Sequence, residues 1–428
     1  MVDKIDAYLT AMLSFAPLWV LIAVPATLII GFLSIPGHSR LYVAVGGMVV
    51  WLACNNFIDL PYVHVIAKPT TVFAYAMTAF AAIIHPGPRR VLPGVVWVYL
   101  LLAFVKFFYV LTVVDLGFAM AIRIQWMMLT ISSLLLVRCV VDDKALSNII
   151  RALSIAAVVI IGMILLGLIF LPSFKNGRFE PLGAPSNIGG VIFTSAAPVC
   201  FYQGIRSPRL LVKTIMFGTA GVGLALAVLT ASRSTVITIL IVMLPLFLYL
   251  SRRPAVTGLA IVVVLGALSW AISFGDEYAT KLDRLESLET DRPDTFVSYL
   301  TTVVKERPLV GLLFSEDQAV LYESAGNPHN AYLYVLYLGG VSLFFPIIAM
   351  AIYTGYCGFY TWRHRMRLDN DPLLISMLVA YMAAIYAHGF VNAEIFYATS
   401  IWPFLHIFLS TLLITAAYDL RRTANEGM

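Results

Sequence analysis

The sequence is poor in charged residues and cysteine and has no close set of metal-ligating side chains. Of its 428 residues, 12% are charged and 61% are hydrophobic, whereas about 25% of the residues of a soluble domain are charged. A soluble fold is therefore excluded. The four cysteines lie far apart without a CxxC pair, so we expect buried packing residues and no disulfide framework. The histidines form no HExxH motif, so no metal, other cofactor or nucleic-acid partner is predicted.

Long apolar runs take the place of charge, and the mean hydropathy is +0.90. A run of about 20 apolar residues crosses a hydrocarbon core of roughly 30 Å as a helix. The lipid offers no hydrogen-bond partners to backbone N–H and C=O groups, and a helix pairs these groups within itself. We therefore predict an all-α, polytopic transmembrane helix bundle of twelve or thirteen spans that forms one membrane domain over residues 1–428. The candidate spans lie near residues 14–35, 41–58, 65–85, 91–114, 117–137, 147–172, 187–205, 210–230, 234–250, 255–274, 330–360, 373–391 and 397–418.

Basic residues cluster in alternate loops between these runs, as they do on the cytoplasmic face of membrane proteins. This pattern predicts a cytoplasmic C-terminus and, with thirteen spans, an N-terminus on the outer side. The clusters hold 15 of the 28 Lys and Arg residues: Arg40, Arg89, Arg90, Arg138, Lys144, Arg206, Arg209, Lys213, Arg252, Arg253, Arg363, Arg365, Arg367, Arg421 and Arg422.

The opposite face has one long segment, residues 275–328. It holds 5 basic and 11 acidic residues, a net charge of −6, while the whole chain has +5. The rest of the chain therefore carries +11, and the two faces differ strongly in charge. Stretches of this segment such as DTFVSYLTTVVKERPLVGLLF are typical of short amphipathic helices that lie on the bundle.

Three places on the outer side carry arginine, against the trend of the other basic residues. Arg178 is in a loop of Gly, Pro and Asn that ends at Asn187, Arg233 is in a tight loop between two spans, and Arg284 and Arg292 are in the long acidic segment. Each of them either pairs with a carboxylate or a lipid head group or contacts an anionic substrate. A planar guanidinium binds phosphate oxygens in pairs, so several of them on one face are suited to a phosphorylated lipid.

The sharpest local signal is GNPHNAYLYVLYLGG, residues 326–340. We expect Asn327 to be the N-cap of a transmembrane helix and Pro328 its first residue, which places His329 in the first turn. The positive end of the helix dipole favours a neutral imidazole there, and a neutral histidine at a wet rim can act as a general base. The alternative is a hydrogen-bonded interfacial histidine beside an aromatic belt.

Other polar residues in or beside the apolar runs have a structural and a functional interpretation. Lys106 and Arg123 are costly inside a membrane unless they are paired or face a cavity, and Arg123 either pairs with Asp115 or approaches the site from below. His388, with Asn392 and Glu394, is the nearest approach to a polar cluster, and we interpret it as satisfying groups at a helix end.

Taken in sequence order, these features resemble the bacterial O-antigen ligase and polymerase superfamily. Four segments carry the resemblance: GRFEPLGAPSN (177–187), SR (232–233), DRPDTFVSYLTTVVKERPLVGLL (291–313) and PHNAYLYVLYLGG (328–340). The last is the most specific, because His329, Asn330 and Gly340 fit the ligase pattern at its spacing. The final position of that pattern is Gly, Thr or Tyr, and here it is Leu343.

The resemblance implies a metal-independent membrane glycosyltransferase of the GT-C type in the bacterial inner membrane. Such enzymes take a glycan from undecaprenyl pyrophosphate at the periplasmic face and transfer it, with inversion, to an acceptor hydroxyl, in a ligase that of a lipid A core sugar. It implies His329, Arg233 and Arg292 as catalytic residues. The candidate substrate-binding residues are Arg178, Arg284, Asn330, Asn187 and Arg123.

Two other functions remain open at this stage. A polysaccharide repeat-unit polymerase would use the same site with a second lipid-linked chain as the acceptor. A lipid-linked glycan transporter also has about a dozen spans and intramembrane charges, but transporters are commonly built from repeats. Here the long charged segment and the outer arginines fall in one half of the chain without a counterpart in the other.

Overall fold

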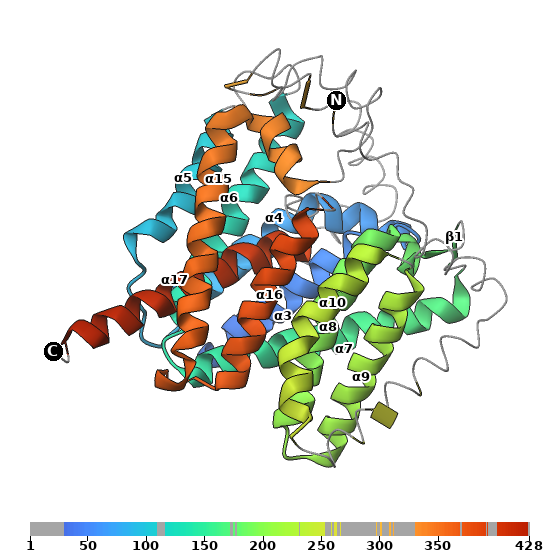
Figure 1. The fold of residues 1–428 in the computed structure, drawn as a ribbon. Helices are drawn as coiled ribbons and strands as arrows, with labels where there is room; N and C mark the ends of the chain where they lie inside the picture. Colours follow the sequence, from blue (N-terminus) through green and yellow to red (C-terminus); the bar gives the residue numbers. More distant parts are fainter. Residues whose placement is uncertain are drawn as a thin grey trace.

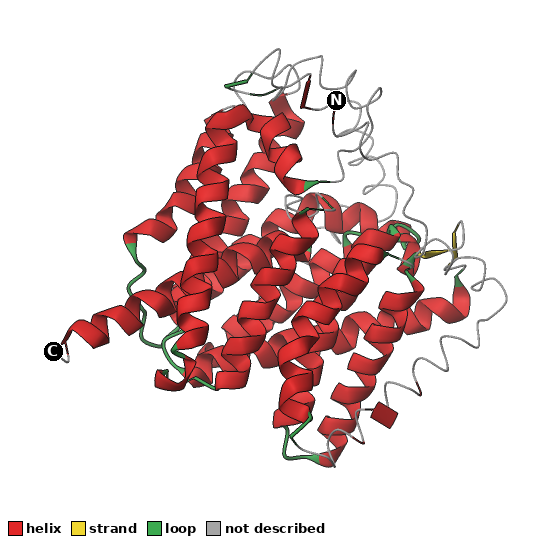
Figure 2. Cartoon of the chain, viewed as in Figure 1, coloured by secondary structure: helices red, strands yellow, loops and turns green. Residues whose placement is uncertain are grey.

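A computed structural model shows the chain as a bundle of helices (Figures 1 and 2). It describes residues 30–108, 116–171, 174–175, 178–230, 232–252, 330–368, 370–390, 392 and 400–426, with positions 258, 261–262, 266, 297, 300–301, 308–309 and 311. The predicted all-α, polytopic architecture is confirmed. The predicted runs at 14–35 and 255–274, and nearly all of segment 275–328, lie outside the described residues, so the count of twelve or thirteen spans stays a prediction.

The described helices follow the predicted apolar runs closely. They are α3 (Gly37–Cys54), α4 (Pro61–Ile83), α5 (Trp97–Phe108), α6 (Leu116–Cys139), α7 (Asp143–Phe170), α8 (Ser186–Arg206), α9 (Leu210–Leu229), α10 (Arg233–Leu250), α15 (Ala331–Arg363), α16 (Pro372–Gly389) and α17 (Ile401–Glu426). Short 3-10 turns lie at Gly94–Val96, Pro181–Gly183 and Arg365–Arg367. An antiparallel pair of two-residue strands, β1 (Phe174–Lys175) and β2 (Arg178–Phe179), precedes α8.

Seven of the described helices are long and apolar enough to cross a membrane: α7, α8, α9, α10, α16, α17 and, within α15, Gly339–Arg363. Their burial differs in a way that defines the layers of the bundle. In α17, 94% of the most apolar stretch is buried, against 28% in α15. A helix that is apolar all round belongs in the interior, and α17 contacts α3, α6, α8, α15 and α16. It is therefore the central helix, while α15 presents a lipid-facing side.

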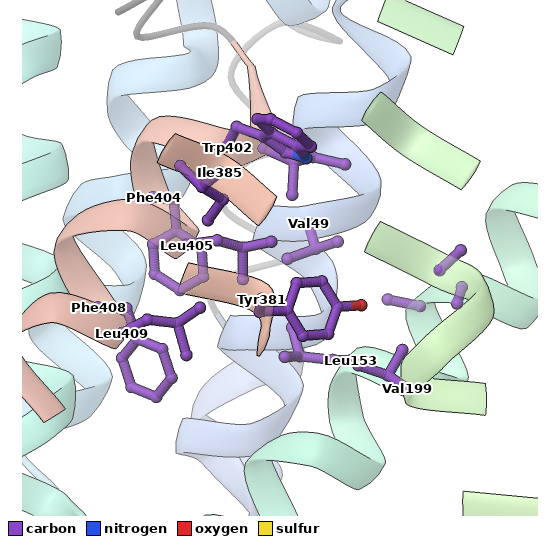
Figure 3. Packing of buried hydrophobic residues seen from close by; sticks show 14 of the residues in the cluster. Val49, Leu153, Val199, Tyr381, Ile385, Trp402, Phe404, Leu405, Phe408 and Leu409 are labelled. Atoms are coloured by element: carbon purple, nitrogen blue, oxygen red, sulfur yellow. The ribbon is translucent and has the colours of Figure 1, made fainter. Parts of the chain in front are cut away.

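Apolar side chains from several helices fill the centre of the bundle. Figure 3 shows Trp402, Leu405 and Phe408 of α17 packed near Tyr381 of α16 and Val49 of α3. Lipid tails are as apolar as the side chains, so the hydrophobic effect does not drive helices together inside a membrane. Close packing of side chains stabilises their association instead. The four cysteines are free and buried, which confirms their interpretation as packing residues.

Ion pairs join the helix ends that carry the predicted cytoplasmic arginines. Arg206 at the end of α8 pairs with Asp371, the N-cap of α16, and the Tyr202 hydroxyl donates to the same carboxylate at 2.7 Å. Arg90 pairs with Asp419 of α17. The predicted basic clusters that are described therefore converge on one end of the bundle, which we call the basic end.

Candidate active site

The end of the bundle opposite the basic end brings together the helix termini that carry the predicted site. Because α8, α9 and α10 run up and down with short connections, the starts of α8 and α10 share this end, and α16 ends there too. The start of α15 joins them through a contact to Phe390, directly after α16. In Figure 1 this is the upper end of α10, α15 and α16. We call it the site end.

Contacts between α8 and α10 bring two of the predicted segments together. The hydroxyl of Ser232, the N-cap of α10, donates a hydrogen bond to the Asn187 side-chain oxygen at 3.3 Å and lies 3.0 Å from the Ser234 hydroxyl. The two helices touch at Gly190, where a Cβ atom would lie 1.9 Å from the Thr235 hydroxyl oxygen. The absence of a side chain at Gly190 therefore lets Asn187, in the first turn of α8, reach the SR motif.

The two described outer arginines lie on either side of this contact. Arg233 is the first residue of α10 and is half-buried. Arg178 is in β2, which contacts α8 and α9. The next residue, Phe179, is buried and stacks on Phe193 of α8 with ring centroids 6.1 Å apart. This aromatic anchor fixes the strand that carries Arg178 to the side of α8.

The rest of the 177–187 loop is fixed by a strained turn. Leu182 has φ 51° and Gly183 has φ 77°, a conformation that L-residues rarely adopt. The Leu182 carbonyl accepts a hydrogen bond from the Asp59 N–H at 2.9 Å, and a Cβ atom on Gly183 would lie 2.6 Å from the Asp59 carboxyl carbon. The loop is thus held against the α3–α4 connection, which also lies at the site end.

Asn330 caps α15 and joins it to α16. Its side-chain oxygen accepts hydrogen bonds from the N–H groups of Tyr332 and Leu333 at 2.9 and 3.0 Å, and its side-chain nitrogen donates to the Phe390 carbonyl at 2.9 Å. The predicted N-cap was Asn327, so that prediction is wrong: α15 begins at Ala331, after Asn330 in an extended conformation. The expectation that His329 lies in the first turn fails with it.

His388 contacts side chains of two other helices, while its predicted role of satisfying groups at a helix end stays a prediction. Its ring is buried and lies 3.3 Å from the Thr238 hydroxyl of α10, and it meets the Trp402 ring edge-on with centroids 4.4 Å apart. The Trp402 N–H donates to the Ser195 hydroxyl of α8 at 3.0 Å. This chain of contacts ties α10, α16, α17 and α8 together just inside the site end.

Arg123 is buried in α6 and faces the start of α15. Its side chain is within electrostatic range of Tyr334, in the first turns of α15. Both interpretations of Arg123, a structural ion pair with Asp115 and an approach to the site from below, stay predictions. The alternative partner, Asp115, lies outside the described residues, as does the Lys106 side chain.

A sharp bend in α15 joins two further segments of the resemblance. Gly340 has φ 57° and ψ −161°, a region that is essentially restricted to glycine. The Val341 and Ser342 N–H groups, which the bend removes from the helix, donate instead to the carbonyls of Pro308 and Leu309 at 2.9 and 3.2 Å. The Pro308 and Leu309 backbone is therefore bound to the LGG stretch, and this contact holds that part of segment 275–328 against α15.

The charge at the described helix starts varies. At the basic end, α7 and α16 are capped by Asp142 and Asp371, whose carboxylates accept hydrogen bonds from first-turn N–H groups, whereas α3 and α9 start without a side-chain cap. At the site end, no acidic residue lies in the first turn of α8, α10 or α15, all of which are described, and neither Pro185 nor Ser232 caps its helix through a side chain. Helix N-termini carry partial positive charge, so this end can bind an anion.

The structure places five of the predicted site residues: Arg123, Arg178, Asn187, Arg233 and Asn330. His329, Arg284 and Arg292 lie outside the described residues, so their roles stay predictions. Within the described part of the chain, no group of three or more His, Cys, Asp and Glu side chains could hold a metal ion.

Sequence reasoning did not single out Thr238, Phe390 or Pro308 as partners of the site. Phe390 and Pro308 act through their backbone carbonyls. Every residue has such a carbonyl, so the sequence cannot show which one is a partner. Thr238 is six residues, nearly two helical turns, beyond Ser232 in the resemblance segment. A comparison of the sequence with models of known protein families and with curated proteins finds no match.

Proposed function

We propose that the protein is a membrane glycosyltransferase of the O-antigen ligase type. It transfers a glycan from undecaprenyl pyrophosphate to the hydroxyl of a lipid A core sugar at the periplasmic face of the bacterial inner membrane. One observation carries the proposal: at the site end, the Ser232–Asn187 and Asn330–Phe390 contacts bring three of the resemblance segments to helix starts without acidic caps. An anionic pyrophosphate is the kind of group that such helix starts and Arg233 attract.

In the proposed reaction, the acceptor oxygen attacks the anomeric carbon of the donor. The bond from that carbon to the pyrophosphate oxygen breaks, and the pair of electrons leaves with undecaprenyl pyrophosphate. His329 takes the proton of the acceptor hydroxyl. Arg233 and Arg292 stabilise the charge that develops on the leaving pyrophosphate, which is the work that a divalent metal does in other phosphate-handling sites.

The proposal is tested with the full chain in lipid nanodiscs, an undecaprenyl-pyrophosphate-linked glycan and a lipid A core acceptor. We expect glycan transfer that falls about 100-fold or more in His329→Ala, within the range for loss of a general base. Arg233→Lys keeps the charge but loses the paired hydrogen bonds, and we expect at least a tenfold loss (~1.4 kcal/mol). Arg252→Lys, on the exposed basic end, is the matched control and keeps full activity. Near-wild-type transfer in both site variants would refute the proposed roles.

A polymerase is the second candidate, because Leu343 departs from the ligase pattern. Leu343 is buried in α15, and a Cβ atom on Gly339 would lie 2.4 Å from its Cβ atom. The departure therefore falls on a packing position beside the bend, not on an exposed acceptor contact. Supplying either the lipid A core or a second lipid-linked glycan as the acceptor separates the two activities. Movement of intact donor across the bilayer without any transfer would favour the transporter instead.

A further inference from the structure

A cavity lies inside the bundle, below the start of α15. It has a volume of about 50 Å³ and is enclosed by α5, α6, α15, α16 and α17. The residues around it that carry polar groups are Tyr99, Trp126, Thr130, Tyr332, Tyr386 and His406. Among the predicted site residues, none lines this cavity, so it is distinct from the candidate active site.

His406 brings an unsatisfied polar atom to the wall of this cavity. Its side chain is only 8% exposed, and its Nε2 atom makes no hydrogen bond to any described residue. Its ring is instead met edge-on by Tyr99 and Tyr386, at centroid distances of 6.1 and 5.5 Å. The Tyr386 hydroxyl is also buried and lies near the Thr354 and Ser410 hydroxyls. His406 Nε2 is therefore a buried polar atom without a direct protein partner among the described residues, and the Tyr386 ring lies against the same imidazole.

A second cavity, deeper in the bundle, provides the contrast. It measures about 30 Å³ and is lined by residues that include Ser195, Ala196, Tyr381 and Leu405. Here the polar groups are satisfied, because the Tyr381 hydroxyl donates to the Ser195 carbonyl at 2.6 Å and the Ser195 hydroxyl donates to the Val191 carbonyl at 2.7 Å. Cavities whose walls are apolar or satisfied stay dry. Figure 3 shows Tyr381 among the apolar side chains of this region.

The size and chemistry of the His406 cavity define what it can bind. A water molecule needs about 10–15 Å³ and two to four polar partners, so the cavity has room for a few waters and is too small for a sugar or a lipid chain. Buried polar groups without a protein partner are normally satisfied by ordered water. We propose that this cavity is an intramembrane hydration site, in which ordered water molecules bind His406 Nε2 and the Tyr386 hydroxyl.

The position of this hydration site gives it a structural role. Tyr332 lines the cavity and donates from its hydroxyl to the Tyr386 carbonyl at 3.0 Å, and it follows the N-cap Asn330 by two residues. On α6, Trp126 and Thr130 share a helix face with Arg123, since they follow it by three and seven residues. The bound water therefore supports the start of α15 and the Arg123 face of α6 from within the membrane. This inference does not depend on the proposed function.

The test is hydroxyl-radical footprinting of the full chain in nanodiscs. The sample is prepared in ¹⁸O-labelled water, and X-rays generate the radicals from that water. Bound water generates radicals where it resides, so we expect ¹⁸O labelling of Tyr386, Trp126 and His406, although Trp126 and His406 are buried and Tyr386 is half-buried. The matched controls are Tyr381 and Trp402, which are 5% and 2% exposed and which stay unlabelled because they lie by the dry cavity.

A pair of variants identifies His406 as the anchor. His406→Phe keeps an aromatic ring but removes the nitrogen, and we expect labelling of Tyr386 to fall about tenfold, the equivalent of one lost hydrogen bond. Ile407→Leu changes an apolar residue on the same wall and leaves the labelling unchanged. Labelling of Tyr386 and Trp126 no stronger than that of Tyr381 and Trp402 overturns the proposal, and so does undiminished labelling in His406→Phe. If His406→Phe does not fold, the comparison of the two cavities in the unmodified protein decides alone.

Discussion

The bend at Gly340 predicts a large effect of one methyl group. In Gly340→Ala, the new Cβ atom would lie 2.6 Å from the Leu309 carbonyl carbon and oxygen and from the Pro308 oxygen, which are backbone atoms that cannot move aside cheaply. A non-glycine residue at this φ and ψ costs about 1–3 kcal/mol. Loss of the two hydrogen bonds from Val341 and Ser342 adds about 0.5–1.5 kcal/mol each. We expect a destabilisation of about 2–6 kcal/mol.

The buried cysteines provide the assay. All four are free and buried, so a thiol-reactive fluorophore reports the thermal unfolding of the detergent-solubilised protein. The matched control is Gly355→Ala in the same helix, where a Cβ atom would meet nothing within 4 Å and where alanine is favoured by about 1 kcal/mol. We expect Gly355→Ala to unfold at or above the unmodified Tm and Gly340→Ala clearly below it. Hydrogen exchange at the Val341 and Ser342 amides should accelerate in Gly340→Ala alone. Equal Tm values and equal exchange in the two variants would refute the reasoning.

Two further predictions concern the ends of the helices. Asn330→Ala loses the N-cap and the bond to the Phe390 carbonyl, for about 1–3 kcal/mol of unfolding free energy; Asn330→Asp keeps the cap, and the same thiol assay should place it between Ala and the unmodified protein. At the basic end, burial lowers the pKa of His85 below 6.5, and positive charge on His38 and Arg89 adds to this effect. Because the pKa of His85 is lower in the folded protein, the unfolded chain takes up the proton first as the pH falls. The contribution of neutral His85 to the free energy of unfolding is therefore full above pH 6.5, decreases below it and levels off below the folded-state pKa. His85→Gln should flatten that dependence in thermal scans between pH 8 and 5, and an unchanged slope would contradict it.

Hydropathy was sufficient to predict the helices but not their bends. The run predicted at 210–230 is α9, Leu210–Leu229, and the run predicted at 234–250 is α10, Arg233–Leu250. The run at 330–360 was predicted as one straight span, yet it bends at Gly340. Apolar composition is the same on both sides of the bend. The bend depends on carbonyl groups some thirty residues earlier in the chain, and local sequence patterns do not contain such a partner.

The N-cap of α15 shows the same limit at the candidate site. The sequence offers two asparagines, Asn327 and Asn330, and the Pro that follows Asn327 favours the first by local rules. The second is the cap because its side-chain nitrogen has a partner, the Phe390 carbonyl, sixty residues away. A local preference of about 1 kcal/mol is easily reversed by one tertiary hydrogen bond of similar size.

The contacts also separate two kinds of residue within the resemblance segments. Gly340 is required by the bend and by the approach of the Pro308 backbone, and Asn330 is required by the cap and its bond to α16. A chain with this fold needs both residues whether or not it transfers glycans. The agreement of Asn330 and Gly340 with the ligase pattern therefore supports a shared fold more than a shared activity. Arg233 is different, because it is the first residue of α10 and the resemblance implies a catalytic role for its guanidinium. Among the described residues of these segments, Arg233 is therefore the one whose exchange for Lys tests the chemistry most directly.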